Sequence, residues 1–407
     1  MSKSTAITII VVVLLAISGG LAWWYFSLGQ SGVGNQNNDS GGINFFPFGN
    51  NNEPTTNDQQ LTTDKENQTE NAPEIREVSR LPVAGFLPLV DNLGFPFVRY
   101  VDQETGNLYD APLEIVSKKR ISNTTIPKIR EVHWLSGGNS FIMRYLDEKD
   151  SLQSFYATLK ENSSAEGSLT GRFLLENISD LSLFRTNSAS TKIFYYLTEN
   201  SVATMFSAES DGSKATHVYS SPMKDWLLYG INDSLAYIQT KSSGLAPSFV
   251  FSLNIKNGTA NPTLSNFIGL SILPNKKGDL ILYSSTPFEY PLLYIYDVNK
   301  KTSTQTSLRT FADKCRWSES NVSRIICAVP TNIPRGTYPD DWYKGTISFS
   351  DNIWEIDSVS GTAKELVSLY KNSFFFDISS FSLSDKDKFL ILQDKTNNSL
   401  WSVRLKQ

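Results

Sequence analysis

Short apolar strands separated by polar turns recur along the chain after residue 74. Each unit is a hairpin: an alternating apolar strand, a polar turn that often holds Asn or Asp with Gly, and a second strand. The equivalent hairpins begin at Leu108, Phe155, Met205, Phe251, Tyr294, Trp354 and Trp401. Recurrence of one unit indicates a repeat architecture.

The repeat is built from four strands. Successive hairpin starts are 47, 50, 46, 43, 60 and 47 residues apart, so a single interval is out of step. A further strand lies upstream of each hairpin, and turns at Leu135, Leu273, Trp317 and Leu383 separate several of these strands from one more short strand. Seven repeats of this kind predict an all-β domain at residues 74–407, a seven-bladed β-propeller with four-stranded antiparallel blades. A pair of β-sandwiches is the alternative.

The ends of this repeat array predict how the ring closes. The last repeat stops soon after Trp401 and lacks a fourth strand, which would leave an open edge. Residues 74–79, EIREVS, have strand character. We expect them to supply the missing outermost strand beside residues 400–405.

Residues 6–26 form an apolar stretch without a charge, AITIIVVVLLAISGGLAWWYF. As a helix it would be about 30 Å long, the thickness of a bilayer's hydrocarbon core. Lys3 precedes it and the next cation is Lys65, which predicts a cytoplasmic segment at residues 1–5, one transmembrane helix, and a C-terminal domain outside the cytoplasm. A cleaved signal peptide is the alternative, but the aromatic cluster Trp23 to Phe26 favours an uncleaved anchor.

Residues 27–73 are rich in Asn, Gln, Gly, Ser and Thr and have little to bury. This composition predicts a disordered linker with a mean reach of about 40 Å. An apolar island, Phe45-Phe46-Pro47-Phe48, interrupts the linker.

Composition narrows the choice of partners and cofactors. The 407 residues include 37 Lys and Arg against 41 Asp and Glu, a net charge of -4, so we expect no nucleic-acid partner. Two Cys and two His are too few for a protein-only zinc site of the usual spacing, and no metal or other cofactor is expected.

Cys315 and Cys327 flank the turn at Trp317, where they would face each other on adjacent antiparallel strands. We expect a disulfide between them in an oxidising compartment, with buried free thiols as the alternative.

The hairpins resemble the blades of bacterial TolB-type and WD-repeat propellers. Ser384-Asp385-Lys386-Asp387 and Asp211-Gly212-Ser213 match the turn motifs of those blades best, although the Trp-Asp dipeptide is absent. The segments KRISNTTIPKIREVHW from Lys119 and YPDDWYKGTISFSDNIW from Tyr338 also resemble an uncharacterised group of membrane-anchored propellers from candidate-phylum bacteria. The resemblance implies a fold and a location at the cell envelope, and no particular activity.

Motifs that carry known chemistry are missing from the sequence. It has no nucleophile elbow, phosphate-binding Gly-rich loop, His-Glu-x-x-His or calcium loop. The preferred hypothesis is therefore a non-catalytic, membrane-tethered binding module outside the cytoplasm, whose partner is an envelope protein, a peptide or a glycan. The alternative is an extracytoplasmic hydrolase that uses loop carboxylates around the propeller channel, two of them within catalytic distance at one mouth.

The interval of 60 residues contains an extra segment of about 13 residues between about Pro330 and Asp351. We call residues 330–351 the insertion. As the second turn of its blade, it should lie on the face that carries the connections between blades. Its mixture of aromatic and charged residues is typical of binding surfaces. The predicted binding residues are Arg335, Tyr338, Asp340, Asp341, Trp342, Tyr343 and Lys344. The alternative is a structural flap packed on its own blade.

Overall fold

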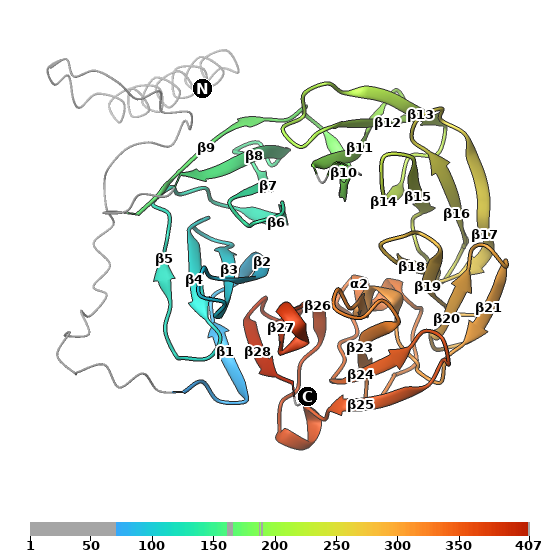
Figure 1. Ribbon diagram of the computed structural model, residues 1–407. Coiled ribbons are helices and arrows are strands. Elements are labelled where there is room, and N and C mark those ends of the chain that lie inside the picture. Colours follow the sequence, from blue (N-terminus) through green and yellow to red (C-terminus); the bar gives the residue numbers. More distant parts are fainter. Residues whose placement is uncertain (1–70, 161–165, 187, 189, 406–407) are drawn as a thin grey trace, which may run out of the picture. The chain divides into compact units, whose positions relative to one another are not determined.

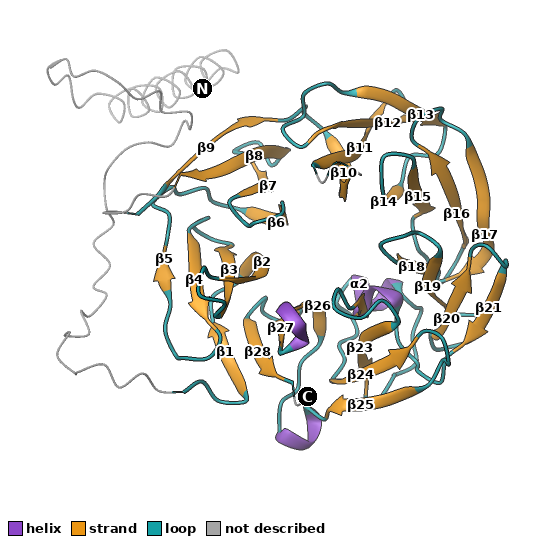
Figure 2. Cartoon of the chain, viewed as in Figure 1, coloured by secondary structure: helices purple, strands orange, loops and turns teal. Residues whose placement is uncertain are grey.

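The computed structural model describes residues 71–160, 166–186, 188 and 190–405. In this part of the chain, strands β1 to β28 form seven four-stranded antiparallel sheets. The sheets follow one another around a ring (Figure 1), and the helices are only short turns between strands (Figure 2). The predicted all-β, seven-bladed propeller is confirmed, and the β-sandwich alternative is wrong.

The predicted membrane segment at residues 6–26 and all but the last residues of the predicted linker lie outside the described residues. Among the helices of the described residues, none is long and apolar enough to cross a membrane. The contacts of the propeller begin at Asn71, which forms a β-bridge with Ile115. The backbone N–H of Ala72 then donates to the carbonyl of Glu114 at 2.8 Å.

The first three blades follow the chain in order from β2 to β13. Blade 1 has β2 (Val83–Val90), β3 (Pro96–Asp102), β4 (Leu108–Pro112) and β5 (Lys119–Arg120). Blade 2 has β6 (Ile129–Trp134), β7 (Ser140–Leu146), β8 (Leu152–Lys160) and β9 (Ser168–Phe173). Blade 3 has β10 (Ile178–Arg185), β11 (Thr191–Glu199), β12 (Val202–Glu209) and β13 (Thr216–Ser221).

The remaining blades complete the ring. Blade 4 has β14 (Trp226–Gly230), β15 (Leu235–Thr240), β16 (Pro247–Asn254) and β17 (Ala260–Ile268). Blade 5 has β18 (Ser271–Pro274), β19 (Leu280–Ser285), β20 (Leu292–Asp297) and β21 (Thr302–Gln305). Blade 6 has β22 (Cys315–Trp317), β23 (Arg324–Pro330), β24 (Asp351–Asp357) and β25 (Ala363–Val367). Blade 7 has β26 (Ile378–Leu383), β27 (Phe389–Asp394), β28 (Leu400–Arg404) and β1 (Ile75–Ser79).

The first strand of each blade lies nearest the ring axis (Figure 1). Because the strands within a blade are antiparallel, the first and third turns leave one face of the ring, and the second turns and the connections between blades leave the other. We call these the first-turn face and the crossover face. The insertion joins β23 to β24 and therefore lies on the crossover face, as expected.

Strand β1 closes the ring as predicted, because it pairs with β28 as the outermost strand of blade 7. Ile75 lies opposite Val403 in this pair. The Arg76 guanidinium extends from β1 to blade 1, where it donates to the carbonyls of Pro112 at 2.8 Å and Ile115 at 2.6 Å. The first and last blades are thus joined by these side-chain hydrogen bonds and by a backbone hydrogen bond from Val83 to the carbonyl of Asn398 at 2.9 Å.

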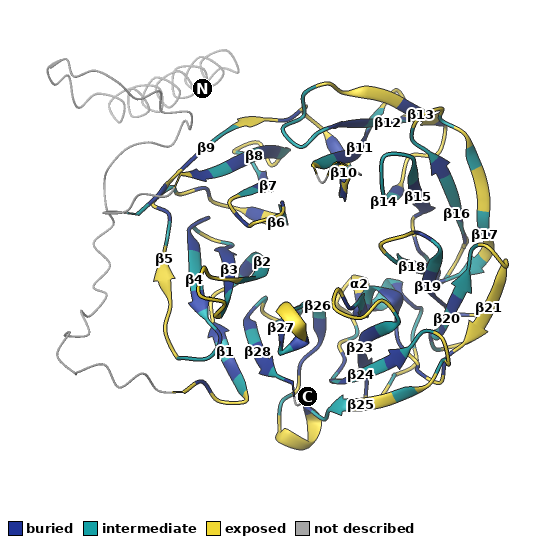
Figure 3. Ribbon diagram, in the orientation of Figure 1, coloured by how far each residue is buried: buried dark blue, intermediate teal, exposed yellow. Residues whose placement is uncertain are grey.

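The hydrophobic core lies between neighbouring blades. In one cluster, Val98 and Tyr100 of blade 1 pack with Phe389 and Ile391 of blade 7. Burial is deepest on the second strand of each blade, such as β7 and β23, and lowest on outer strands such as β5 and β21 (Figure 3). Near the axis the blades approach so closely that a side chain at Gly85 would clash, since its Cβ would lie 2.8 Å from Cβ of Val132.

Cys315 and Cys327 form a disulfide, as predicted. They lie directly opposite each other in the β22–β23 pair, and among the described residues there is no free cysteine. The alternative of buried free thiols is wrong for this structure.

Candidate functional site

A pocket of about 810 Å³ opens at the axis on the first-turn face. Its walls come from the first strands of blades 1 to 6, from the first turns of several of these blades and from the third turn of blade 6, so it is the mouth of the ring on this side. Apolar side chains form much of the wall, including Leu87, Leu183, Ile231, Leu273, Trp317 and Val322. A concave, mostly apolar site with a few polar groups is the usual form of a ligand pocket.

The first turn of blade 5 carries two lysines to the rim of this pocket. The turn between β18 and β19 is closed by a backbone hydrogen bond from Asn275 to Leu280 at 2.9 Å, and Gly278 adopts the left-handed conformation that the turn requires. The side-chain amide of Asn275 donates to the Asp279 carboxylate at 2.7 Å. This rigid turn leaves Lys276 and Lys277 exposed.

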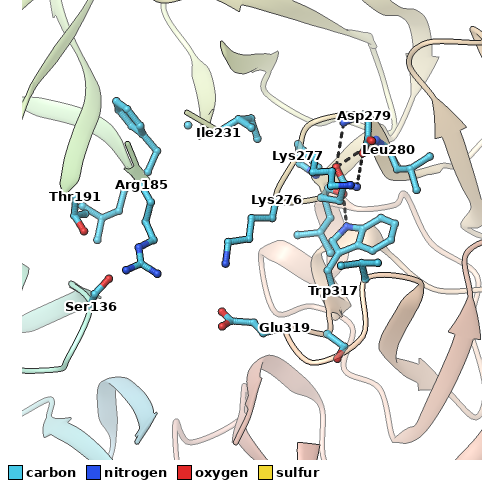
Figure 4. Close-up of a pocket in the computed structure, with 18 of the residues that line it drawn as sticks. Ser136, Arg185, Thr191, Ile231, Lys276, Lys277, Asp279, Leu280, Trp317 and Glu319 are labelled. Atoms are coloured by element: carbon cyan, nitrogen blue, oxygen red, sulfur yellow. Dashed lines mark hydrogen bonds between the residues drawn. The ribbon is translucent and has the colours of Figure 1, made fainter. Parts of the chain in front are cut away.

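Three charged side chains point into the open space of the mouth: Arg185 from the end of β10, Lys276 from blade 5 and Glu319 from blade 6 (Figure 4). Across the described residues, none of these three side chains forms a hydrogen bond or an ion pair within the protein. They are therefore available to a ligand. The nearby wall is fixed, because the indole N–H of Trp317 donates to the carbonyl of Leu273 at 3.0 Å.

Charged groups on the two inner strands of blade 2 and on the first strand of blade 3 are bound within the protein. The Arg144 guanidinium lies 2.5 Å from the Glu131 carboxylate and also donates to the carbonyl of Ile178 at 2.6 Å. Burial opposes ionisation of Glu131, but His133 and Arg144 together lower its pKa to about 2. Burial raises the pKa of Asp180 to about 6, although its carboxylate accepts a hydrogen bond from the backbone of Leu228. These groups join neighbouring blades rather than facing a ligand.

The insertion forms a short helix, α2 (Asp340–Tyr343), and much of it is structural. Tyr338 and Trp342 are only 2% and 3% exposed. The Asp340 carboxylate accepts a hydrogen bond from the backbone of Gly244 at 2.6 Å, and that of Asp341 accepts one from the backbone of Thr337 at 2.6 Å. Of the predicted binding residues, Tyr338 and Trp342 are therefore not at the surface, because they fill the space between the insertion and the connections beneath it.

The other predicted binding residues lie at the surface. Arg335 is exposed and its guanidinium lies 3.2 Å from the Glu289 carboxylate. Tyr343 is 42% exposed and its hydroxyl donates to Asp313. Lys344 is exposed at the end of α2. These three residues are exposed, as the hypothesis of a binding surface on the insertion requires.

A buried lysine beneath the insertion was not expected from the sequence. The Lys314 ammonium lies 2.8 Å from both the Asp351 and the Asp377 carboxylates, and all three side chains are fully buried. The same ammonium lies 4.6 Å from the Trp342 ring, whose indole N–H donates to Asp377 at 3.0 Å. This cluster locks the insertion onto the connections that enter blades 6 and 7.

The pocket gives the hydrolase alternative no assembled catalytic pair. Its lining holds two carboxylates, and Glu319 points into the mouth while Asp279 is held against the wall by Asn275 (Figure 4). Within the described ranges, no group of three or more His, Cys, Asp and Glu side chains could hold a metal ion. The arrangement of this mouth suits recognition of a ligand that has both charged and apolar groups.

The fold and this mouth define a seven-bladed β-propeller with an open pocket at one end of its axis. No protein-family model matches the sequence, and no curated protein matches it. Solved structures similar to it include the β-propeller domain of the Trilobed protease from Pyrococcus furiosus, with a TM-score of 0.51 and 12% identity over 80% of this chain and 97% of that one. That domain is described as having an open velcro topology, whereas β1 closes the ring here.

Two further similar structures have identities of 10% or less. The tricorn protease has a TM-score of 0.51 and 9% identity over 82% of this chain, which spans only 34% of that protease. TolB from Acinetobacter baumannii has a TM-score of 0.42 and 10% identity over 79% of this chain and 80% of its own. The two likenesses with a TM-score of 0.51 show a shared propeller fold and no activity. They give no support to the expected relation to candidate-phylum bacteria.

Proposed function

We propose that this protein is a non-catalytic binding module, tethered to the cell membrane by residues 6–26, whose propeller lies outside the cytoplasm and receives an envelope partner in the first-turn pocket. The observation that carries the proposal is the set of unpaired charges, Arg185, Lys276 and Glu319, within a pocket whose wall is otherwise largely apolar. Such a site has polar groups to orient a ligand and apolar area to bind it.

The aliphatic wall favours a protein or peptide partner over a glycan. Leu87, Leu183 and Ile231 offer surface for apolar side chains, which a sugar lacks. Arg185 and Lys276 would pair with carboxylates of the partner, and such pairs are screened by salt. Binding should therefore weaken as ionic strength rises.

The experiment is a pull-down with the full chain from its own solubilised membranes. The double variant Arg185→Glu and Lys276→Glu should lose the partner, because both cations become carboxylates beside Glu319. A matched control is Lys256→Glu with Lys301→Glu, which reverses two exposed lysines in the third turns of blades 4 and 5, outside the pocket. Equal partner recovery by the two double variants, both folded, would overturn the assignment of this pocket.

The proposed location is tested separately. In intact cells, externally added protease should digest the propeller, and the remaining fragment should stay with the membrane. Protection of the propeller until the membrane is broken would place it inside the cytoplasm and contradict the proposal.

A further inference from the structure

Four connections meet on the crossover face around the insertion. Besides the insertion itself they are residues 241–246 of blade 4, residues 286–291 of blade 5, and residues 306–314 between blades 5 and 6. We call the exposed side chains of these connections the insertion surface. Its members used below are Lys241, Leu245, Phe288, Arg309, Arg335 and Lys344.

The backbone beneath the insertion surface is rigid. The Thr286 hydroxyl donates to the carbonyl of Tyr338 at 2.9 Å, which ties the blade 5 connection to the insertion. Asp340 holds the blade 4 connection through the backbone of Gly244. The Phe311 ring stacks on Trp342 at 5.3 Å. The four connections therefore present their outer side chains as one fixed surface.

Two large apolar side chains project from this surface. Leu245 is 80% exposed and Phe288 is 69% exposed. Neither fills any part of the core, and both lie in second turns, which all leave the same face of the ring. Apolar side chains held on rigid turns gain free energy only when another apolar phase covers them.

The exposed charges of the same four connections are mostly cations. Lys241, Arg309, Arg335 and Lys344 are exposed, whereas Glu289 is the only exposed carboxylate among the described residues of the four connections. Glu289 is paired with Arg335, and the Arg309 guanidinium lies 4.3 Å from the Tyr290 ring. The remaining acids, Asp313, Asp340, Asp341 and the buried Asp351, accept hydrogen bonds from the protein. This local excess of cations contrasts with the net charge of -4 of the whole chain.

We propose that the insertion surface docks on an anionic lipid bilayer, with Phe288 and Leu245 entering the interfacial region and the four cations facing lipid phosphates. Exposed apolar side chains flanked by Lys and Arg are the combination that holds proteins at a membrane interface. The inference rests on the proposed location of the domain beside a membrane. The linker expected from the sequence has a mean reach of about 40 Å and does not restrict which face meets the bilayer. Docking of the crossover face would leave the first-turn pocket open to a partner.

The test uses the full chain in lipid nanodiscs, with a fluorophore that reports the polarity around one position. The native cysteines are bonded to each other, so Phe288→Cys provides a single free thiol for labelling with the environment-sensitive dye NBD. Leu93→Cys is the control, because Leu93 is 82% exposed in the first turn of blade 1, on the opposite face and outside the pocket. In discs containing anionic lipid, the dye at 288 should shift to the blue and the dye at 93 should not.

The charge requirement is tested by lipid composition and by one further variant. The blue shift at 288 should be lost in zwitterionic discs, and it should also be lost in anionic discs when Arg309→Glu and Lys344→Glu are added, provided that the variant melts as the parent does. An unchanged emission at 288 in anionic discs, or an equal shift in both compositions, would overturn the proposal. A shift that requires added membrane proteins would assign the surface to a protein partner instead.

The experiment distinguishes failure of the proposed membrane tether from failure of the proposed docking. If the chain does not co-purify with nanodiscs, the membrane tether is wrong, and labelled protein mixed with vesicles of the same two compositions then measures docking directly. Arg185→Glu with Lys276→Glu should abolish partner recovery and leave the emission at 288 unchanged.

Discussion

The ammonium nitrogen of Lys314 lies 2.8 Å from a carboxylate oxygen of Asp377, and neither side chain has any exposed surface. Asp351 approaches the same ammonium at an equal distance. Lys314 precedes the first strand of blade 6, Asp377 precedes that of blade 7, and Asp351 ends the insertion. A single buried cation therefore joins two blades and the insertion.

Lys314→Met should destabilise the propeller by about 3–5 kcal/mol, because it leaves two buried carboxylates without their cation. The free energy of unfolding in urea measures this change. Lys344→Met is the matched control, since Lys344 is exposed on the insertion, and a surface substitution of this kind should change stability by no more than about 0.5 kcal/mol. Equal stabilities of the two variants would show that the buried pairs contribute nothing net.

Stability should rise as the pH is lowered from 7 to 5. Burial raises the pKa of Asp351 to about 6 even though Lys314 opposes the shift, and burial likewise raises that of Asp180 to about 6. Because these groups bind a proton more tightly in the folded than in the unfolded chain, their protonation stabilises the fold. The urea midpoint measured from pH 8 downward should increase over this range, and the increase should be smaller in Asp351→Asn.

The same profile should turn downward at lower pH. The pKa of Glu131 is lowered to about 2, despite its burial, by His133 and Arg144. Its ionised form therefore contributes stability that is lost as the pH falls below about 4.5 toward 2. A midpoint that decreases steadily from pH 7 to pH 5 would contradict the assignment of Asp351 and Asp180.

The fold was predictable because its signals are local. The hairpin of each repeat can be recognised in the sequence by its polar turn. In the turn at Asp357, the carboxylate accepts a hydrogen bond from the backbone N–H of Ser360 at 2.7 Å, beside Gly361 in the left-handed conformation. Counting strands then identified the unpaired edge that β1 fills. Both arguments need only the order of residues along the chain.

The sites were less predictable because they depend on contacts between distant segments. Lys314, Asp351 and Asp377 look like ordinary polar residues in sequence, and nothing local indicates that they meet. The composition of the insertion predicted Trp342 as a binding residue, but composition does not distinguish a buried aromatic side chain from an exposed one. The first turns were recognised as turns, yet their convergence into a pocket with Arg185 and Lys276 follows from the ring as a whole.

Arg76→Ala should weaken closure of the ring. The guanidinium donates three hydrogen bonds from blade 7 to carbonyls of blade 1, those of Pro112, Ile115 and Ser117. Hydrogen bonds of a charged group contribute about 1.5–3 kcal/mol each at most, so we expect a loss of a few kcal/mol and a lower melting temperature. Arg80→Ala is the control, because the side chain of Arg80 is 87% exposed and pairs only with Glu77.

Deletion of residues 74–80 should lower the melting temperature further than Arg76→Ala does, because it also removes the β1 ladder and reopens an edge of blade 7. A deletion variant that melts like the parent would show that the ring is not held closed by β1.

Trp342→Ala separates the structural part of the insertion from its surface. The indole is 3% exposed, stacks on Phe311 and donates to Asp377, so its removal should cost about 3–5 kcal/mol of unfolding free energy. Tyr343→Ala should cost only about 1 kcal/mol, because that ring is half exposed and loses mainly one hydrogen bond. If Trp342→Ala melts like the parent, the insertion is not a structural lock. If instead the folded Tyr343→Ala variant loses a membrane partner, the predicted binding role of the insertion would be supported at its exposed residues, which are Arg335, Tyr343 and Lys344.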